Sequence, residues 1–148
     1  MDKFIAVING PNLNILGKRE PEIYGSTTLE EIVDRLKEKA KIAGFSVQAT
    51  QSNSEGAIVD EIQRVSEACC GIIINPAAYT YTSVAIRDAL SAVKVPVIEV
   101  HLSNIFAREE FRKHSYVSPV ATAVISGFGA RSYFLALDGM IELVRSQN

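Results

Sequence analysis

Apolar residues follow two patterns along the chain, and these patterns predict its regular elements. Five short apolar runs are rich in Val and Ile and show little alternation, which is typical of strands that are buried on both faces. They cover residues 4–8, 45–50, 71–74, 95–100 and 121–125. Elsewhere apolar residues recur every three or four positions, which predicts amphipathic helices. We expect these helices over residues 28–43, 54–65, 83–93 and 133–144, with a short helix before the fifth run and a frayed end over 145–148.

The order of these elements predicts the fold. Strands and helices alternate along the whole chain, which favours a three-layer α/β fold with a parallel sheet covered by helices on both faces. Because crossovers between parallel strands are right-handed, few topologies remain for five strands. We predict the flavodoxin-like strand order 2-1-3-4-5. A chain of 148 residues is long enough for one sizeable core, so we expect residues 1–148 to form a single domain.

Charge and composition then narrow the class of protein. The formal charge is −2 and the sequence has no Lys/Arg run, so no basic surface for binding nucleic acid is expected. No apolar run approaches the ~20 residues that a membrane-spanning helix needs, and residues 1–3 lead directly into the first run, so no cleaved signal peptide is expected. Cys69 and Cys70 are adjacent, which favours small buried side chains over a disulfide or metal site. We expect a cytoplasmic protein that binds neither nucleic acid nor membrane.

Polar residues follow three of the predicted strands. The first strand ends in Asn9 to Asn12, the third in Asn75-Pro76 and the fourth in Glu99 to Ser103. In the predicted order these strands surround the point where strand order reverses. Open parallel sheets bind ligands there, beyond the carboxyl ends of the strands. The sequence therefore predicts a cleft at this edge.

Two residues in this cleft have more than one interpretation. His101 is a candidate catalyst because Glu99, two residues earlier, shares its strand face and can orient or charge the ring. A histidine at a strand end can also be structural, and Asn75 can either bind a polyhydroxylated ligand or cap a turn. His114 has no such neighbours and is interpreted as a surface residue. Residues 108–113 form a charged stretch typical of a solvated face, from which one arginine could turn inward to a carboxylate substrate.

The longest irregular segment, residues 9–25, is rich in Asn, Gly and Pro, and no regular element is expected in it. Loops of this length are usually lids or binding loops, although an irregular surface loop is the alternative. The segment carries Arg19 and Tyr24, a cation and a phenol. No G-x-G-x-x-G motif, Walker loop or serine elbow is present. The remaining groups suit proton transfer next to a carbonyl.

With these residues in place, the sequence resembles the type II 3-dehydroquinate dehydratase family (type II dehydroquinases). The resemblance is carried by four groups of segments: Asn9 to Asn14 with Arg19 to Pro21 and Tyr24-Gly25; Gln51 to Gly56; Asn75-Pro76 with Tyr79-Thr80 and Thr82 to Ala89; and Glu99 to Asn104 with Arg108-Glu109 and Phe111-Arg112. They run from the first predicted strand to the fifth, so the resemblance covers essentially the whole domain.

The resemblance implies a single catalytic domain with a flavodoxin-like fold, no metal or organic cofactor, and a homododecamer built as a tetramer of trimers. The implied reaction is anti elimination of water from 3-dehydroquinate to give 3-dehydroshikimate through an enolate. This is the third step of chorismate biosynthesis in the shikimate pathway. The same step also serves quinate breakdown, and the sequence leaves that choice open.

The resemblance also implies roles for single residues. Tyr24 would be the proton acceptor, His101 the proton donor and Arg19 a transition-state stabiliser beside Tyr24. A nearby guanidinium favours the phenolate form of a phenol, which is the physical reason for that pairing. Asn12 would position a water that stabilises the enolate, and Glu99 would orient His101. The residues implied to bind substrate are Asn75, Tyr81, the backbone at Leu102 and Ser103, Arg112, and Asp88 from a neighbouring subunit.

Two neighbouring positions depart from the family pattern. Ala77 stands where the family usually has glycine, and Tyr81 where it usually has histidine. Ala77 limits backbone freedom if the turn needs a positive φ. Tyr81 cannot be cationic near pH 7, so we expect an effect on substrate affinity more than on the elimination.

Two rival functions remain beside the dehydratase hypothesis. One is a flavodoxin-like binding protein that lost turnover through the change at Tyr81. The other is a structural oligomer whose loop only mediates assembly. Under the dehydratase hypothesis, residues 9–14 form a fixed floor and residues 17–25 form a mobile lid, hinged by its glycines, which brings Arg19 and Tyr24 over the substrate.

Overall fold

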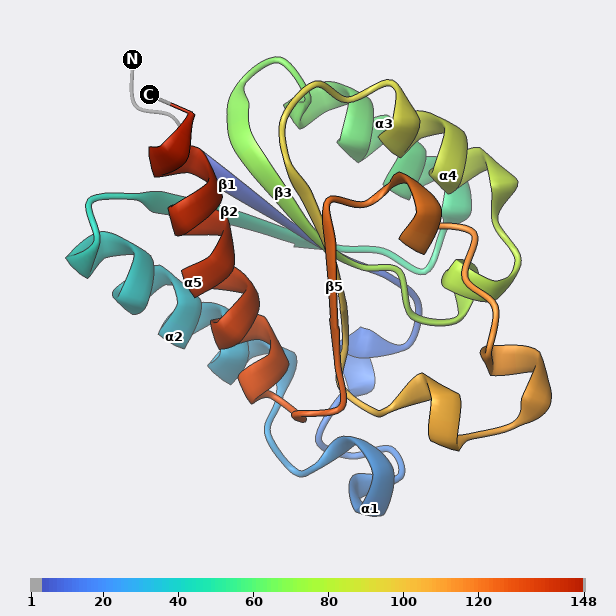
Figure 1. Ribbon diagram of the computed structural model, residues 1–148. Coiled ribbons are helices and arrows are strands. Elements are labelled where there is room, and N and C mark those ends of the chain that lie inside the picture. The colour runs from blue at the N-terminus through green and yellow to red at the C-terminus, as the bar shows by residue number, and fades with distance from the viewer. Residues whose placement is uncertain (1–3, 148) are drawn as a thin grey trace.

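The computed structural model describes residues 4–147 and contains one five-stranded sheet (Figure 1). Its strands are parallel and lie in the order β2-β1-β3-β4-β5. They span Phe4–Asn9 (β1), Ser46–Gln51 (β2), Cys69–Asn75 (β3), Val97–His101 (β4) and Ala123–Ser126 (β5). The predicted fold class and strand order are confirmed.

Helices cover both faces of the sheet. On one face α2 (Leu29–Ile42) and α5 (Arg131–Ser146) pack on strand residues such as Ile5 and Val7. On the other face α3 (Glu55–Val65) and α4 (Val84–Ser91) pack on Ala6 and Ile8. Figure 1 shows the two pairs of helices on opposite sides of the strands. The core is therefore two apolar clusters separated by the sheet, as the three-layer prediction requires.

Hydroxyl side chains fix the starts of three helices. Thr28 accepts a hydrogen bond from the Glu31 N–H, Ser54 accepts one from Ala57, and Ser83 accepts one from Ile86. Each bond satisfies an N–H group of the first helical turn that has no partner within the helix. The N-cap expected at Ser54 is confirmed.

Several predicted boundaries and one burial prediction were wrong. The second, fourth and fifth strands begin one or two residues later than expected, and the short helix expected before the fifth strand is three separate 3-10 turns. The edge strands β2 and β5 are largely half-buried or exposed, because each has a neighbour on one side only. α5 continues to Ser146, and Arg145 donates a hydrogen bond to the Ala43 carbonyl, so no fraying begins at residue 145. The expectations for residues 1–3 and for Asn148 lie outside the described residues.

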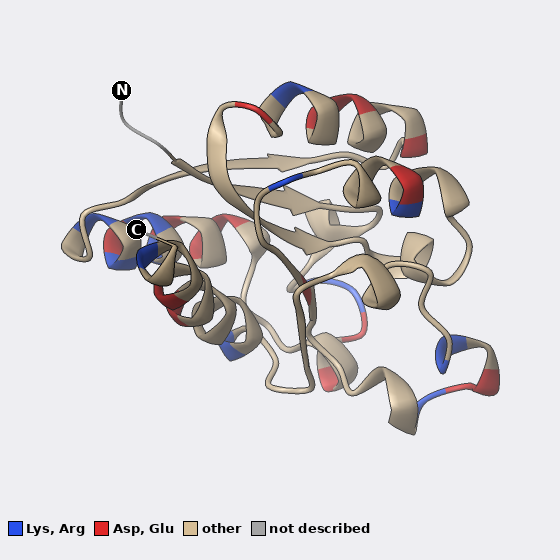
Figure 2. Cartoon of the chain, turned by 45° about the horizontal axis from the view of Figure 1, so that its top comes forward, with Lys and Arg blue, Asp and Glu red and all other residues tan. Residues whose placement is uncertain are grey.

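The sheet holds a single charged side chain among its described strands, Glu99 of β4. Figure 2 shows the other Lys, Arg, Asp and Glu residues on helices and loops. A buried charge is costly unless it is paired and hydrogen-bonded, so Glu99 marks the part of the sheet where a function is expected. Across residues 4–147, none of the helices combines the length and apolar character needed to span a bilayer.

Candidate active site

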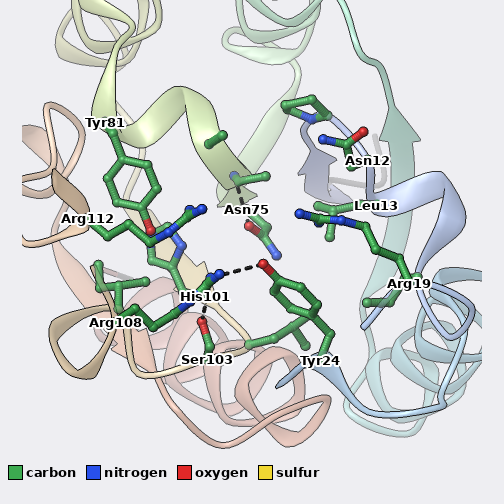
Figure 3. A pocket seen from close by; sticks show the side chains of 16 residues that line it. Asn12, Leu13, Arg19, Tyr24, Asn75, Tyr81, His101, Ser103, Arg108 and Arg112 are labelled. Carbon is green, nitrogen blue, oxygen red and sulfur yellow. Dashed lines mark hydrogen bonds between the residues drawn. The ribbon is translucent and has the colours of Figure 1, made fainter. Parts of the chain in front are cut away.

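A cavity opens at the carboxyl ends of β1, β3 and β4, where the strand order predicted it. Register places Asn9 level with both Gln51 and Asn75, and Ile74 level with Glu99, so the polar residues after these strands share one edge. Figure 3 shows the side chains that line the cavity. The lining residues are Pro11, Asn12, Leu13, Leu16, Arg19, Tyr24, Asn75, Ala77, Ala78, Tyr81, His101, Leu102, Ser103, Ile105, Arg108 and Arg112.

The floor of the cavity is held by hydrogen bonds from the end of β2 and the loop after it. Asn12 has a left-handed backbone, with φ of 69°, which asparagine tolerates better than most residues. Its N–H donates to the Asn53 Oδ1 atom at 3.0 Å, and Gln51 Nε2 donates to the Gly10 carbonyl at 3.2 Å. These bonds support the expectation that residues 9–14 form a fixed floor.

His101 and Glu99 form a buried pair. The His101 Nε2 and Glu99 Oε2 atoms are 2.5 Å apart, and the His101 and Glu99 side chains are 5% and 0% exposed. The geometry expected from their two-residue spacing is confirmed. Because Nε2 is held by the carboxylate, Nδ1 is the ring nitrogen left to act on a ligand. The carboxylate therefore fixes the orientation of the imidazole ring in the cavity.

Three hydroxyls hold the Glu99 carboxylate from behind. Thr80 and Ser115 donate to Oε2 at 2.7 and 2.9 Å, and Ser118 donates to Oε1 at 2.5 Å. Burial alone raises the pKa of Glu99, but the hydrogen bond and charge of His101, together with the Ser118 and Thr80 hydroxyls, outweigh it and lower that pKa below its usual value. Glu99 does not itself line the cavity, and His101 is the cavity residue that it contacts.

Tyr24 reaches the cavity from the lid. It ends a short helix, α1 (Pro21–Tyr24), so the expectation that residues 9–25 hold no regular element was wrong. Proline is well suited to the first turn of a helix, where its missing N–H is not needed. Gly17 and Gly25, with φ of 92° and 83°, lie before and after this helix. The structure has the lid over the cavity, and whether it opens stays a prediction.

The Tyr24 phenol is hydrogen-bonded by Arg108, a contact that the sequence-based pairing of Tyr24 with Arg19 did not include. The Arg108 Nη1 atom lies 2.9 Å from the Tyr24 oxygen (Figure 3). Arg19 lies against the ring instead, with its guanidinium carbon 5.0 Å from the ring centroid, and makes an ion pair with Glu20 at 3.4 Å. The sequence signal for Arg108 was the charged stretch 108–113, from which one inward arginine was expected. Both Arg108 and Arg112 line the cavity.

Tyr81 and Arg112 form the opposite wall. The Arg112 guanidinium carbon is 5.3 Å from the Tyr81 ring centroid, and Glu109 pairs with the same guanidinium. Burial raises the pKa of Tyr81, and the hydrogen bond and charge of Arg112 only partly offset this, so Tyr81 presents a neutral phenol. Leu102 and Ser103 also line the cavity. Asp88 is exposed on α4 and does not line the cavity of its own chain, and His114 is exposed as expected.

Ala77 has a positive φ of 50°, which is the condition under which its side chain was expected to limit the backbone. A left-handed residue with a Cβ atom costs about 1–2 kcal/mol. Strain of this kind is often concentrated at functional sites. The turn at Ala77 forms part of the cavity wall, so the strain lies within the site.

Ala77→Gly should therefore raise the free energy of unfolding by about 1 kcal/mol, because glycine adopts this backbone without the clash. Urea denaturation measures the change. The neighbouring Ala78 has no positive φ, so Ala78→Gly should instead lower stability by about 0.5–1 kcal/mol. Equal effects of the two substitutions would show that strain at Ala77 contributes nothing.

The site brings together the groups that an acid–base reaction needs. Tyr24 meets a guanidinium, and His101 meets a carboxylate, in one cavity lined by several further hydrogen-bonding groups. Such a set can remove one proton and deliver another. Across residues 4–147, no group of three or more His, Cys, Asp or Glu side chains is placed to hold a metal ion. Cys69 and Cys70 are buried, as expected.

Comparisons with known proteins agree with this chemistry. The sequence model of the family described as "Dehydroquinase class II" matches residues 3–141. A 3-dehydroquinate dehydratase of Gloeothece citriformis is 59% identical over 141 residues, which is 95% of this chain and 93% of the relative. The 3-dehydroquinate dehydratase 2 of Pseudomonas aeruginosa is 55% identical over 142 residues, or 96% of each chain. The crystal structure of a type II dehydroquinase from Butyrivibrio crossotus superposes with a TM-score of 0.91 at 48% identity, covering 94% of this chain and 97% of that one.

Proposed function

Since the chain belongs to the class II dehydroquinase family, we propose that Tyr24 and His101 divide its reaction between a base and an acid. The reaction is the dehydration of 3-dehydroquinate to 3-dehydroshikimate, a hydro-lyase step of the shikimate pathway. The observation that carries the proposal is the pairing of each group in one cavity, Tyr24 with Arg108 and His101 with Glu99. Residues 1–148 act as a single catalytic domain.

Tyr24 removes the C2 proton of the substrate. A neutral phenol is a weak base near pH 7, so it must first become phenolate. The Arg108 N–H donates to the phenol oxygen at 2.9 Å, and the Arg19 guanidinium lies beside the ring. A donor and a positive charge placed beside this oxygen can stabilise the negative charge that it carries when it acts as a base. Arg108 is therefore the residue that best accounts for Tyr24 acting as a base. The positive charge of Arg19 adds to the positive potential at the ring.

Loss of the C2 proton gives an enolate, whose negative oxygen must be stabilised. Hydrogen-bond donors that are already in place where charge develops often supply the largest part of catalysis. Asn12 lies on the fixed floor of the cavity and serves this role through a water molecule that it positions. The substrate itself is held by Asn75, Tyr81, the backbone at Leu102 and Ser103, and Arg112, and all five residues line the cavity.

His101 then completes the anti elimination. Its protonated ring donates the Nδ1 proton to the C1 hydroxyl, which leaves as water while the enolate electrons form the new double bond. Glu99 holds Nε2 and stabilises the imidazolium until that transfer. Every proton in this scheme moves on side chains of the protein, so the scheme uses no metal and no organic cofactor.

The proposal extends to assembly and location. Asp88 is exposed on α4, where it is accessible to a second copy of the chain. We propose that it reaches a neighbouring subunit's site within a homododecamer, a tetramer of trimers, in the cytoplasm. Sedimentation of the purified protein as a monomer would contradict this assembly.

An absorbance assay tests the function directly. Adding 3-dehydroquinate to the purified protein in the presence of EDTA should raise the absorbance of the conjugated enone product. Binding of substrate without product would instead favour a non-catalytic binding protein. Tyr81→His, assayed beside the unmodified protein, should change KM more than kcat, because Tyr81 contacts substrate but transfers no proton in the scheme.

A further inference from the structure

A buried tyrosine joins two asparagines at the floor of the site. Tyr133 of α5 is 0% exposed, and its hydroxyl lies 2.7 Å from Asn9 Oδ1 and 2.9 Å from Asn75 Nδ2. Asn9 and Asn75 are the last residues of β1 and β3 and lie level with each other in the sheet. Of the three residues, only Asn75 lines the cavity.

The two ends of this chain of hydrogen bonds fix its direction. At one end the Ala77 N–H, which can only donate, points to Asn75 Oδ1 at 3.0 Å. At the other end the Thr50 carbonyl, which can only accept, receives Asn9 Nδ2 at 3.0 Å. Between them, Asn75 Nδ2 donates to the Tyr133 oxygen and the Tyr133 hydroxyl donates to Asn9 Oδ1. Turning the Asn75 amide over would set its N–H₂ group against the Ala77 N–H, donor against donor.

We propose that Tyr133 is a positioning residue for catalysis, because it locks the Asn75 side-chain amide so that an N–H, and not the oxygen, is offered to the substrate. Asn75 Oδ1 is held by Ala77 and one Nδ2 hydrogen by Tyr133, which leaves the second Nδ2 hydrogen for an oxygen of the ligand. This inference rests on the proposed role of Asn75 in binding 3-dehydroquinate. It deepens that role by stating that Asn75 acts as a donor to a substrate oxygen.

The surroundings of Tyr133 support this assignment. Each polar side chain of this buried triad has a hydrogen-bond partner, which is what allows it to stay buried at the ends of the strands. Complete burial raises the pKa of Tyr133 above its ordinary value, so the phenol keeps the proton that it donates to Asn9. A run of hydrogen bonds in one direction also strengthens each member by polarisation. The triad of Asn9, Tyr133 and Asn75 thus links the strand ends at the cavity to α5, a helix that itself contributes no lining residue.

A double-mutant cycle on kcat/KM separates positioning from simple structural support. Tyr133→Phe keeps the ring and removes the hydroxyl, and it should lower kcat/KM about tenfold through loss of the Asn75 orientation. Asn75→Ala should also lower kcat/KM. If Tyr133 acts through Asn75, adding Tyr133→Phe to Asn75→Ala should cause little further loss, since the coupled group is already gone.

One further variant controls for stability, and another tests the same assignment from the Asn9 side. Ile141→Val trims the core of α5 away from the triad, so it should lower the melting temperature without changing kcat/KM. Asn9→Leu removes the acceptor of the Tyr133 hydroxyl, and it should reproduce the loss in kcat/KM and the dependence on Asn75. It also tests the assignment if Tyr133→Phe does not fold.

Three other outcomes would contradict the proposal that Tyr133 positions Asn75. Equal losses from Tyr133→Phe in both backgrounds would mean that the hydroxyl acts on the fold as a whole. A lower melting temperature with unchanged kcat/KM would mean the same. Unchanged kcat/KM in Asn75→Ala would remove Asn75 from the substrate contacts and overturn the proposed role of Asn75 as well, whereas a loss in Asn75→Ala alone would leave that role standing.

Discussion

Tyr24→Phe should lower kcat by roughly 10²–10⁴-fold, the range that a positioned general base contributes, while substrate still binds. The substitution removes one oxygen atom and keeps the ring that lies beside Arg19 and Arg108. The wall formed by Tyr81 and Arg112, together with Asn75, remains in place to hold 3-dehydroquinate. Steady-state kinetics would measure kcat, and calorimetry with the variant would measure the dissociation constant.

Tyr116 provides the matched control for this experiment. It lies outside the cavity, and its backbone carbonyl rather than its hydroxyl accepts from Arg87. Tyr116→Phe should therefore keep the kcat of the unmodified protein. If Tyr24→Phe kept that kcat as well, Tyr24 could not be the base, and another group would have to remove the C2 proton.

His101→Asn should lower kcat by a similar roughly 10²–10⁴-fold, because no acid then protonates the departing hydroxyl. Asparagine keeps a hydrogen-bonding group near the buried Glu99 carboxylate, which limits the cost of leaving that charge without its partner. The variant should bind substrate. Circular dichroism would confirm that the sheet is intact before kinetics are compared.

His114, the second histidine of the chain, provides the matched control for His101→Asn. His114 is exposed and lies outside the cavity, so His114→Asn should leave kcat unchanged. Comparable kcat values for the two variants would show that His101 delivers no proton in a rate-determining step.

The fold was largely predictable from the sequence, and the error in predicting which strands are buried has a physical cause. The apolar runs identified all five strands, most clearly β1, β3 and β4, which are buried along their whole length. β2 and β5 carried the same kind of run but are edge strands with partly exposed side chains. A run of Val and Ile indicates a strand, whereas the burial of its two faces depends on neighbours that local sequence does not specify.

The helix in the lid was missed for a related reason. Residues 17–25 are rich in turn formers, yet Pro21–Tyr24 is helical. A single helical turn is unfavourable in isolation and persists where tertiary contacts stabilise it. Tyr24 packs against the core below the lid and bonds to Arg108, and neither contact follows from local composition.

The sequence by itself determined the helices and strands and the pairing of His101 with Glu99, because these follow from residue spacings of 2 or about 3.6. The layers followed from the alternation of strands and helices, and the strand order and the edge of the sheet where the site lies followed from the connections that parallel strands allow. Only the tertiary structure decided that Arg108, 84 residues from Tyr24, bonds its phenol, and that Tyr133, 124 residues from Asn9, joins two strand ends. The physical reason is that parallel strands bring distant segments to one edge, where the direction of each side chain depends on packing and hydrogen bonds across the sheet.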